Sequence, residues 1–310
     1  MDRNTQKRII LFKVQTTHGV DPLPTAAANA VLVYDLSTKP LVSSKKERKP
    51  VRGFPGKNPS KLADQHIEIS FKVELAGSGA AGTAPAVGPL LRTSALAELI
   101  TAGQKVEYTP IIDSQEEGTF YYHKDGALHK IVDAKGEATL TLLKGDVAMA
   151  SFRFIGRVGG RVVTANPATP AYTSWKDALI VNDTNTGDLT LGGTAYPSTG
   201  FEFSFGNGLA FKTLLGKEVV RISDRNPSGK VSLDLTPTEE LALIAKTENS
   251  ETLSLSIAHG TTAGNIVTIS APAAQLLEPN EEEQNGDMMH GFSVDLLPVN
   301  GLDEFKITFA

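Results

Sequence analysis

The chain has 310 residues, of which 40% are hydrophobic and 21% are charged, and a formal net charge of −5 at pH 7. This composition indicates a folded chain with a sizeable core, not a disordered one. The chain has no cysteine, which excludes disulfides, thiolate metal sites and a cysteine nucleophile. The weak net charge argues against a protein that grips nucleic acid by its phosphates, though not against one that nucleic acid slides past.

The first half of the chain is predicted to be rich in strands. Residues 1–30 are interpreted as an N-terminal arm, and residues 37–65 as a long polar loop that contains a basic run. Turns of the hairpin type are expected at 124–126 and 133–136, and an irregular linker is expected at 159–178. The predicted strands lie at 9–14, 31–34, 66–75, 106–112, 118–123, 128–132, 137–143 and 148–157.

The most patterned stretch runs from His66 to Ala102. Apolar and polar residues alternate from Ile67 to Leu75, which predicts a strand with one buried face. A loop of small residues follows at 76–88 and is interpreted as a flexible joint that becomes ordered against a neighbour. An apolar helix is predicted to start at Pro89, because proline is tolerated in the first helical turn.

The second half of the chain again shows alternating strands and one helix. Thr236 followed by Pro237 and acidic residues predicts the start of a helix. Asn-Pro-Ser occurs at 58–60 and again at 226–228, before corresponding strand–helix units. We therefore predict a mainly β fold made of two tandem β-sandwich or barrel domains, 1–165 and 166–310, each with one flanking α-helix. The predicted strands of this half lie at 179–181, 189–191, 201–205, 231–235, 253–257, 267–269, 292–296 and 305–309.

No motif predicts an active site. The glycine-rich loop lacks the Gly-Lys-Ser/Thr of a P-loop, and no Gly-x-Ser-x-Gly elbow is present. The six histidines form no metal-type pair; His123 and His129 could face each other across a hairpin, but ordinary surface histidines are favoured. The sequence predicts no catalytic residue, no cofactor and no metal site, and so no enzyme.

Two charge runs stand out, a basic one at Lys45, Lys46, Arg48 and Lys49, and an acidic one from Glu278 to Glu283 that includes three consecutive glutamates at 281–283. Runs of this kind usually belong to solvated loops. The alternative is that they meet across two copies of the chain, where opposite charges would fix orientation. The predicted candidates for contacts between subunits are Lys45, Lys46, Arg48, Lys49, Gly77, Gly79, Gly82, Glu281, Glu282 and Glu283.

Parts of the chain resemble the major tail (tail tube) proteins of long-tailed bacteriophages, most specifically over residues 20–98. The resemblance implies rings of subunits that stack into a tube through which DNA passes during infection, and no catalytic residues. Family members often have one tube domain and form hexameric rings, so two domains per chain would give a trimeric, pseudo-sixfold ring, with a hexamer as the alternative. The residues that carry the resemblance are DPLPT at 21–25, ANAVLV at 28–33, the region 48–53, VELAGSGAAGTAP at 73–85 and GPLLR at 88–92.

The sequence thus favours a structural virion protein that assembles with itself and with other tail proteins in the host cytoplasm. DNA would pass through the lumen without specific binding, and no run of apolar residues is long enough for a membrane span. The N-terminal arm and the loops 37–65 and 76–88 are the predicted contacts between rings. The alternative is a monomeric β-sandwich that binds a ligand such as a carbohydrate, which would normally present a row of exposed aromatic side chains.

Overall fold

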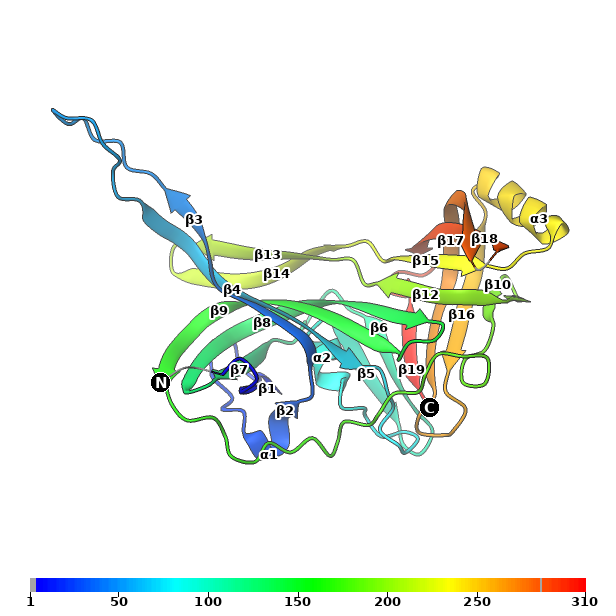
Figure 1. The fold of residues 1–310 in the computed structure, drawn as a ribbon, viewed down its shortest axis with the longest axis horizontal. Helices are drawn as coiled ribbons and strands as arrows, with labels where there is room; N and C mark the ends of the chain where they lie inside the picture. Colours follow the sequence, from blue (N-terminus) through cyan, green and yellow to red (C-terminus); the bar gives the residue numbers. More distant parts are fainter. Residues whose placement is uncertain (1–3, 285) are drawn as a thin grey trace.

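The computed structural model describes residues 4–284 and 286–310, so the first three residues of the predicted N-terminal arm lie outside it (Figure 1). The described strands form one antiparallel sheet of 17 strands and a separate two-stranded hairpin. The strands of the first half are β1 (Arg8–Val14), β2 (Ala30–Val31), β3 (Tyr34–Lys46), β4 (Lys61–Glu74), β5 (Leu96–Thr101), β6 (Lys105–Pro110), β7 (Gly118–Lys124), β8 (Ala127–Leu143) and β9 (Met149–Val163). Those of the second half are β10 (Leu189–Leu191), β11 (Thr194–Tyr196), β12 (Ser198–Ser204), β13 (Asn207–Leu214), β14 (Lys217–Arg225), β15 (Ser228–Leu233), β16 (Thr252–His259), β17 (Val267–Gln284), β18 (Asp287–Leu297) and β19 (Lys306–Phe309).

Three helices accompany the described strands: α1 (Ala26–Asn29), α2 (Gly88–Arg92) and α3 (Pro237–Glu248). The mainly β class predicted from the sequence is confirmed. The helix predicted from Thr236 is α3, which starts with a capping box: Thr236 accepts a hydrogen bond from the backbone of Glu239, whose side chain accepts one from the backbone of Thr236. The helix predicted from Pro89 to Ala102 is largely wrong, because α2 has five residues and the chain then turns into β5. Leu96, the first residue of β5, is fully covered by the core, and sheet pairing with β6 outweighs local helix propensity.

The same order of strands occurs in each half of the sheet. In the first half, hydrogen-bonded neighbours follow the order β2-β1-β7-β8-β9-β4-β3. In the second half they follow β11-β10-β16-β17-β18-β15-β12. Each strand of one series therefore has a counterpart in the other, with β8 corresponding to β17 and β3 corresponding to β12.

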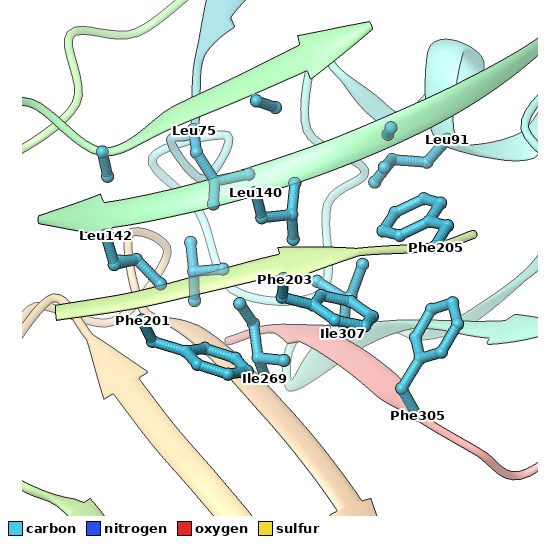
Figure 2. Packing of buried hydrophobic residues seen from close by; sticks show 14 of the residues in the cluster. Leu75, Leu91, Leu140, Leu142, Phe201, Phe203, Phe205, Ile269, Phe305 and Ile307 are labelled. Atoms are coloured by element: carbon cyan, nitrogen blue, oxygen red, sulfur yellow. The ribbon is translucent and has the colours of Figure 1, made fainter. Parts of the chain in front are cut away.

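The two halves are joined by strand pairing across residue 165. β12 pairs with the end of β8, with Phe203 opposite Leu140, and β19 pairs with β6, with Phe309 opposite Val106. One hydrophobic cluster also runs through both halves. Figure 2 shows Leu140 and Leu142 beside the phenylalanines of β12, with Phe305 packed under them. The division into two domains remains a prediction, and its two parts share a core.

Two predicted loops are strands in the structure. The turn predicted at 133–136 is a β-bulge within the unbroken strand β8, where the register to β9 shifts between Val132 and Lys135. Asp133 has a φ of 53° there, a conformation that Asp tolerates better than most residues. The loop predicted at 37–65 is in fact the paired strands β3 and β4 with a connection at 47–60, because irregular register shifts hide the alternation of β3 from a sequence reading.

The β13–β14 hairpin lies across the sheet instead of extending it (Figure 1). It follows β12 directly and returns into β15. The ring of Phe211 lies 4.9 Å from that of His66 on β4, and Thr213 donates a 2.6 Å hydrogen bond to Asp64. Val220, which belongs to β14, is fully buried. This hairpin of the second half therefore covers part of the first half, which no local pattern in the sequence predicted.

Candidate assembly surface

Eight neighbouring strands form a continuous wall that spans both halves of the chain, in the order β3-β4-β9-β8-β12-β15-β18-β17. One face of the wall packs on the core, for example through Phe71, Phe152 and Phe203. The other, here called the open face, carries partly or fully exposed side chains that are mainly serine, threonine and charged residues. Its central rows are Lys72, Ser151, Thr139, Ser204, Ser228 and Asp295, then Glu74, Met149, Thr141, Glu202, Lys230 and Ser293, with Ser70, Arg153 and Glu137 in the row beside them.

Charges on the first-half end of this face are paired. Glu68 accepts contacts from Lys39 at 2.8 Å and from Arg153 at 3.2 Å. Burial alone would raise the pKa of Glu68, but the hydrogen bond from Lys39 and the charge of Arg153 outweigh burial and hold the pKa below its ordinary value. Lys72 pairs with Asp35 at 2.8 Å. These basic side chains are therefore partly neutralised before any ligand approaches.

Tyr34, the first residue of β3, is bonded to the open face. Its hydroxyl donates a 2.6 Å hydrogen bond to Glu74, and this bond, together with burial, raises the pKa of Tyr34 to about 12. Glu74 also accepts a 2.7 Å hydrogen bond from the backbone of Ala178. Glu74 thus anchors the predicted linker segment to the sheet.

Both ends of the wall are open edges. Within the described part of the chain, β3 pairs with β4 on one side and has no strand on the other. At the far end, β17 pairs with β16 only as far as Gln275, so the same edge of β17 beyond Leu277 has no strand partner among the described residues. Unpaired strand edges present rows of N–H and C=O groups that favour pairing with another chain.

The predicted basic run lies on one of these edges. β3 and β4 continue beyond the body of the molecule as a long arm, defined here as residues 41–65 (Figure 1). Lys45 and Lys46 end β3, and Arg48 and Lys49 follow in the exposed connection at 47–60. Val51 and Phe54, near the tip of the arm, are exposed apolar residues.

The predicted acidic run lies on the other edge. Glu281, Glu282 and Glu283 form the exposed end of β17, opposite His290, Met289 and Met288 of β18. The hairpin that contains them, defined here as residues 278–291 and called the acidic hairpin, stands beside α3 at the opposite end of the molecule from the arm (Figure 1). The structure therefore does not bring the two charge runs together within one chain.

The three predicted loop glycines are packed within the chain. The N–H of Gly77 donates to Asn265 at 2.9 Å, and the N–H of Gly79 donates to the carbonyl of Gly264 at 2.9 Å. A Cβ on Gly82 would lie 2.2 Å from the backbone nitrogen of Gly103. The loop at 76–88 thus makes a close contact between the two halves of the chain, where the sequence predicted a joint that becomes ordered against a neighbour. A contact of these glycines with a neighbouring subunit remains a prediction.

The bulge in β8 organises a buried polar cluster. Asp133 is fully buried, and its carboxylate accepts hydrogen bonds from the backbone of Gly19 at 2.7 Å and from Gln15 at 3.0 Å. Arg157 contacts the other oxygen at 2.6 Å. Burial would raise the pKa of Asp133, but the hydrogen bonds from Gln15, Gly19 and Arg157 outweigh burial and keep it below its ordinary value.

Three side chains that could bind a metal ion lie at this cluster. His18, Glu117 and Asp133 bring ligand atoms within 4.8 Å of one another, but Asp133 is already neutralised by Arg157, and His18 contacts Glu117 at 2.7 Å. The cluster thus has the contacts of an ion-pair network that fixes the N-terminal segment. His123 and His129 do not face each other: His123 lies opposite Leu128 and His129 opposite Tyr122.

Exposed aromatic side chains are few in the described part of the chain: Tyr34 and Phe54. The single tryptophan, Trp175, is partly buried and donates a 2.9 Å hydrogen bond to the carbonyl of Ala30. Flat sugar rings are usually bound by rows of exposed aromatic rings. The surface of the described residues does not offer such a row.

No helix in the described ranges is long and apolar enough to cross a membrane. A comparison with curated proteins gave no match. The family model described as phage tail tube protein matches residues 5–300, which is nearly the whole chain and includes both series of strands. The chain therefore belongs to the phage tail tube protein family and is a structural protein of the virion tail.

Proposed function

We propose that copies of this chain join edge to edge into closed rings, and that the rings stack into a tube through which DNA passes. The observation that carries this proposal is the eight-stranded wall with an open edge at each end. A contact between two different edges of identical subunits is a head-to-tail contact, and such contacts close into rings when the rotation allows. Pairing would also remove the open edges, which are otherwise a hazard for aggregation.

We propose three chains per ring. The wall contains two series of strands in the same order, so one chain would supply two similar segments of the ring and three chains would supply six. The pairing of β12 with β8 already joins two such segments within one chain. A ring of six chains is the alternative.

We propose that the open face of the wall lines the lumen. Its central rows carry many Ser and Thr hydroxyls, together with three basic residues, Lys72, Arg153 and Lys230, against four acidic ones, Glu74, Glu137, Glu202 and Asp295. Binding to DNA strengthens with each phosphate that a cation neutralises. A lumen with this balance would let DNA pass without holding it.

Electron microscopy of the concentrated protein in negative stain tests the proposal. Tubes with a central channel are expected, and native mass spectrometry of released rings is expected to give the mass of three chains. Six chains per ring would contradict the proposed stoichiometry only. A monomer that forms neither rings nor tubes at any concentration would contradict ring assembly and favour the monomeric binding module.

A shortened arm tests the role of the arm tip in assembly. Lys46 and Lys61 are directly opposite in the β3–β4 ladder, so an Asn-Gly turn can replace residues 47–60 without a change of register. The variant is expected to fold with an unchanged unfolding midpoint, because the removed residues are exposed, but to form no tubes. Tubes of normal length from this variant would show that the tip is not needed for assembly.

A further inference from the structure

The bulge in β8 has a counterpart at the corresponding place in β17. In β8 the register to β9 shifts between Val132 and Lys135, and Asp133 has a φ of 53°. In β17 the register to β18 shifts between Leu277 and Asn280, and Glu278 has a φ of 51°. Together with the matching strand order, this places the two long hairpins in detailed correspondence, with Asp133 equivalent to Glu278.

Beyond its bulge, β8 changes partner. Up to Ala134 its outer edge pairs with β7, and from Thr139 to Leu143 the same edge pairs with β12. The hairpin that continues from β12 then lies over the bulge, so that Lys135 and Ile155, on the open face, become buried. This junction between the two halves therefore has two parts: an edge pairing and a hairpin laid across the neighbour.

Among the described residues, the corresponding edges of β17 and β3 have no strand partner. The outer edge of β17 pairs with β16 up to Gln275 and then has no strand partner among the described residues. In β8 the equivalent edge pairs with β12, so the position that a counterpart of β12 would take beside β17 has no strand. That counterpart is β3, whose outer edge is also without a strand in the described ranges. The arm continues from β3 as the β13–β14 hairpin continues from β12. Its base contacts that hairpin, where Thr213 donates a hydrogen bond to Asp64, and beyond this contact the arm projects from the body of the molecule (Figure 1).

The charges of the arm and of the acidic hairpin are complementary. Between residues 45 and 61 the arm carries one acidic residue, Glu47, and seven basic ones: Lys45, Lys46, Arg48, Lys49, Arg52, Lys57 and Lys61. Between residues 278 and 287 the acidic hairpin carries no lysine or arginine and five acidic residues: Glu278, Glu281, Glu282, Glu283 and Asp287.

The acidic side chains include one on the surface that the arm would cover. A Cβ on Gly291 would lie 2.5 Å from Asn280 and 2.6 Å from Glu282, so both side chains lie over that glycine on the open face. Asn280 and Gly291 are the counterparts of Lys135 and Ile155, which the β13–β14 hairpin covers in the first half.

We propose that the arm of one copy binds the acidic hairpin of a second copy, and that this contact repeats between chains the junction that β12 and the β13–β14 hairpin make within a chain. β3 would pair antiparallel with the free edge of β17, and the basic arm would lie across the open face at Asn280 and Glu282. The inference rests on the proposed ring and specifies its interface: the partner is a second copy of this chain, bound head to tail.

Cross-linking between engineered cysteines tests the contact directly, because the chain has no cysteine of its own. Lys45→Cys and Glu283→Cys are made in separate chains, mixed, assembled and treated with a short bis-maleimide. A cross-linked dimer is expected from the mixture and not from either variant alone. Glu251→Cys, an exposed position just beyond α3, replaces Glu283→Cys in the control mixture and is expected to give none. In the chain with both substitutions, the ladder of products should end at the number of chains per ring.

Charge reversal with rescue supplies an independent measurement. Reversal of the arm (Lys45→Glu, Lys46→Glu, Arg48→Glu and Lys49→Glu) or of the acidic hairpin (Glu281→Lys, Glu282→Lys and Glu283→Lys) places like charges together. Each is expected to raise the concentration needed for assembly by about tenfold or more, and the combination of both is expected to restore it to within about threefold. The control reversal, Glu248→Lys with Glu251→Lys at the exposed end of α3, should change it by less than about twofold.

The outcomes separate this inference from the proposed function. Rings that form without the cross-link, or equally well with either reversal, would overturn the arm–hairpin contact and leave ring assembly intact. Failure of the unsubstituted chain to form rings would overturn the proposed function and the inference with it. Two reversals that each block assembly without rescuing each other would show that both segments matter but do not meet.

Discussion

The buried carboxylate of Asp133 and the partly exposed guanidinium of Arg157 form an ion pair, 2.6 Å apart, at the point where β8 changes partner from β7 to β12. The same carboxylate holds the N-terminal segment through Gln15 and Gly19. One side chain at the bulge thus fixes the register of the sheet and the segment that crosses it. Loss of the Asp133 carboxylate should therefore lower the stability of the whole chain.

Asp133→Asn is expected to lower the free energy of unfolding by about 2 kcal/mol, because a neutral amide weakens the hydrogen bonds that the buried carboxylate accepts from Gln15, Gly19 and Arg157. Asn tolerates a positive φ as Asp does, so the backbone of the bulge is retained. Urea unfolding curves measure the change. Asp113→Asn, at an exposed position, is the control and should change the free energy by less than about 0.5 kcal/mol.

The contribution of Asp133 should also depend on pH in one direction. Its pKa is lower in the folded chain than in the unfolded one, where it is about 3.9. Its stabilisation is therefore complete above pH 4 and is lost as the pH falls through the folded value. The difference between the unsubstituted chain and Asp133→Asn should be constant from pH 5 to 7 and shrink below pH 4. A difference that grows towards low pH would contradict this assignment.

Gly77→Ala should destabilise the chain by about 2 kcal/mol, because the new Cβ would lie 2.1 Å from the carbonyl oxygen of Gly264 and the backbones must separate. Gly53→Ala is the matched control. A Cβ on Gly53 meets nothing within 4 Å, and the change should be neutral or slightly stabilising. Equal melting temperatures for the two variants would show that the loop at 76–88 is not packed as described.

Phe203→Ala tests whether the two halves unfold together. Phe203 is fully buried, 4.7 Å from the ring of Phe305, in the core that β12 shares with β8. A loss of about 4 kcal/mol is expected in a single transition, as followed by Trp175 fluorescence and by hydrogen exchange of amides in both halves. Separate transitions for the two halves would show that they unfold as independent domains. Phe54→Ala, on the exposed arm, is the control.

Thr236→Ala should remove the capping box of α3 and cost about 1 kcal/mol, while Thr236→Ser should retain most of the stability. Thr238→Ala, at the exposed second residue of α3, is expected to have little effect. Thermal unfolding followed by circular dichroism compares the three variants. Similar losses at both threonines would indicate that the cap does not act as described.

The β class, most of the strand positions and α3 can be predicted from the sequence alone, because alternation and capping are local patterns that need no distant partner. The alternation from Ile67 to Val73 and the box at Thr236 and Glu239 are examples, and both are present in the structure. The resemblance to tail tube proteins also depended on local motifs, and it is confirmed by the match over residues 5–300.

The way in which the segments join depends instead on tertiary contacts. The break in alternation at Asp133 gives the same sequence signal as a turn, and it becomes a bulge because β9 runs alongside it through the shift. Leu96 is in a strand because β6 and β19 extend the sheet beside it. The two charge runs, which the sequence could read as solvated loops or as partners, lie on the two unpaired edges of one wall. That placement follows from pairings between strands that are distant in the sequence, such as β12 with β8 and β15 with β18, which no local pattern records.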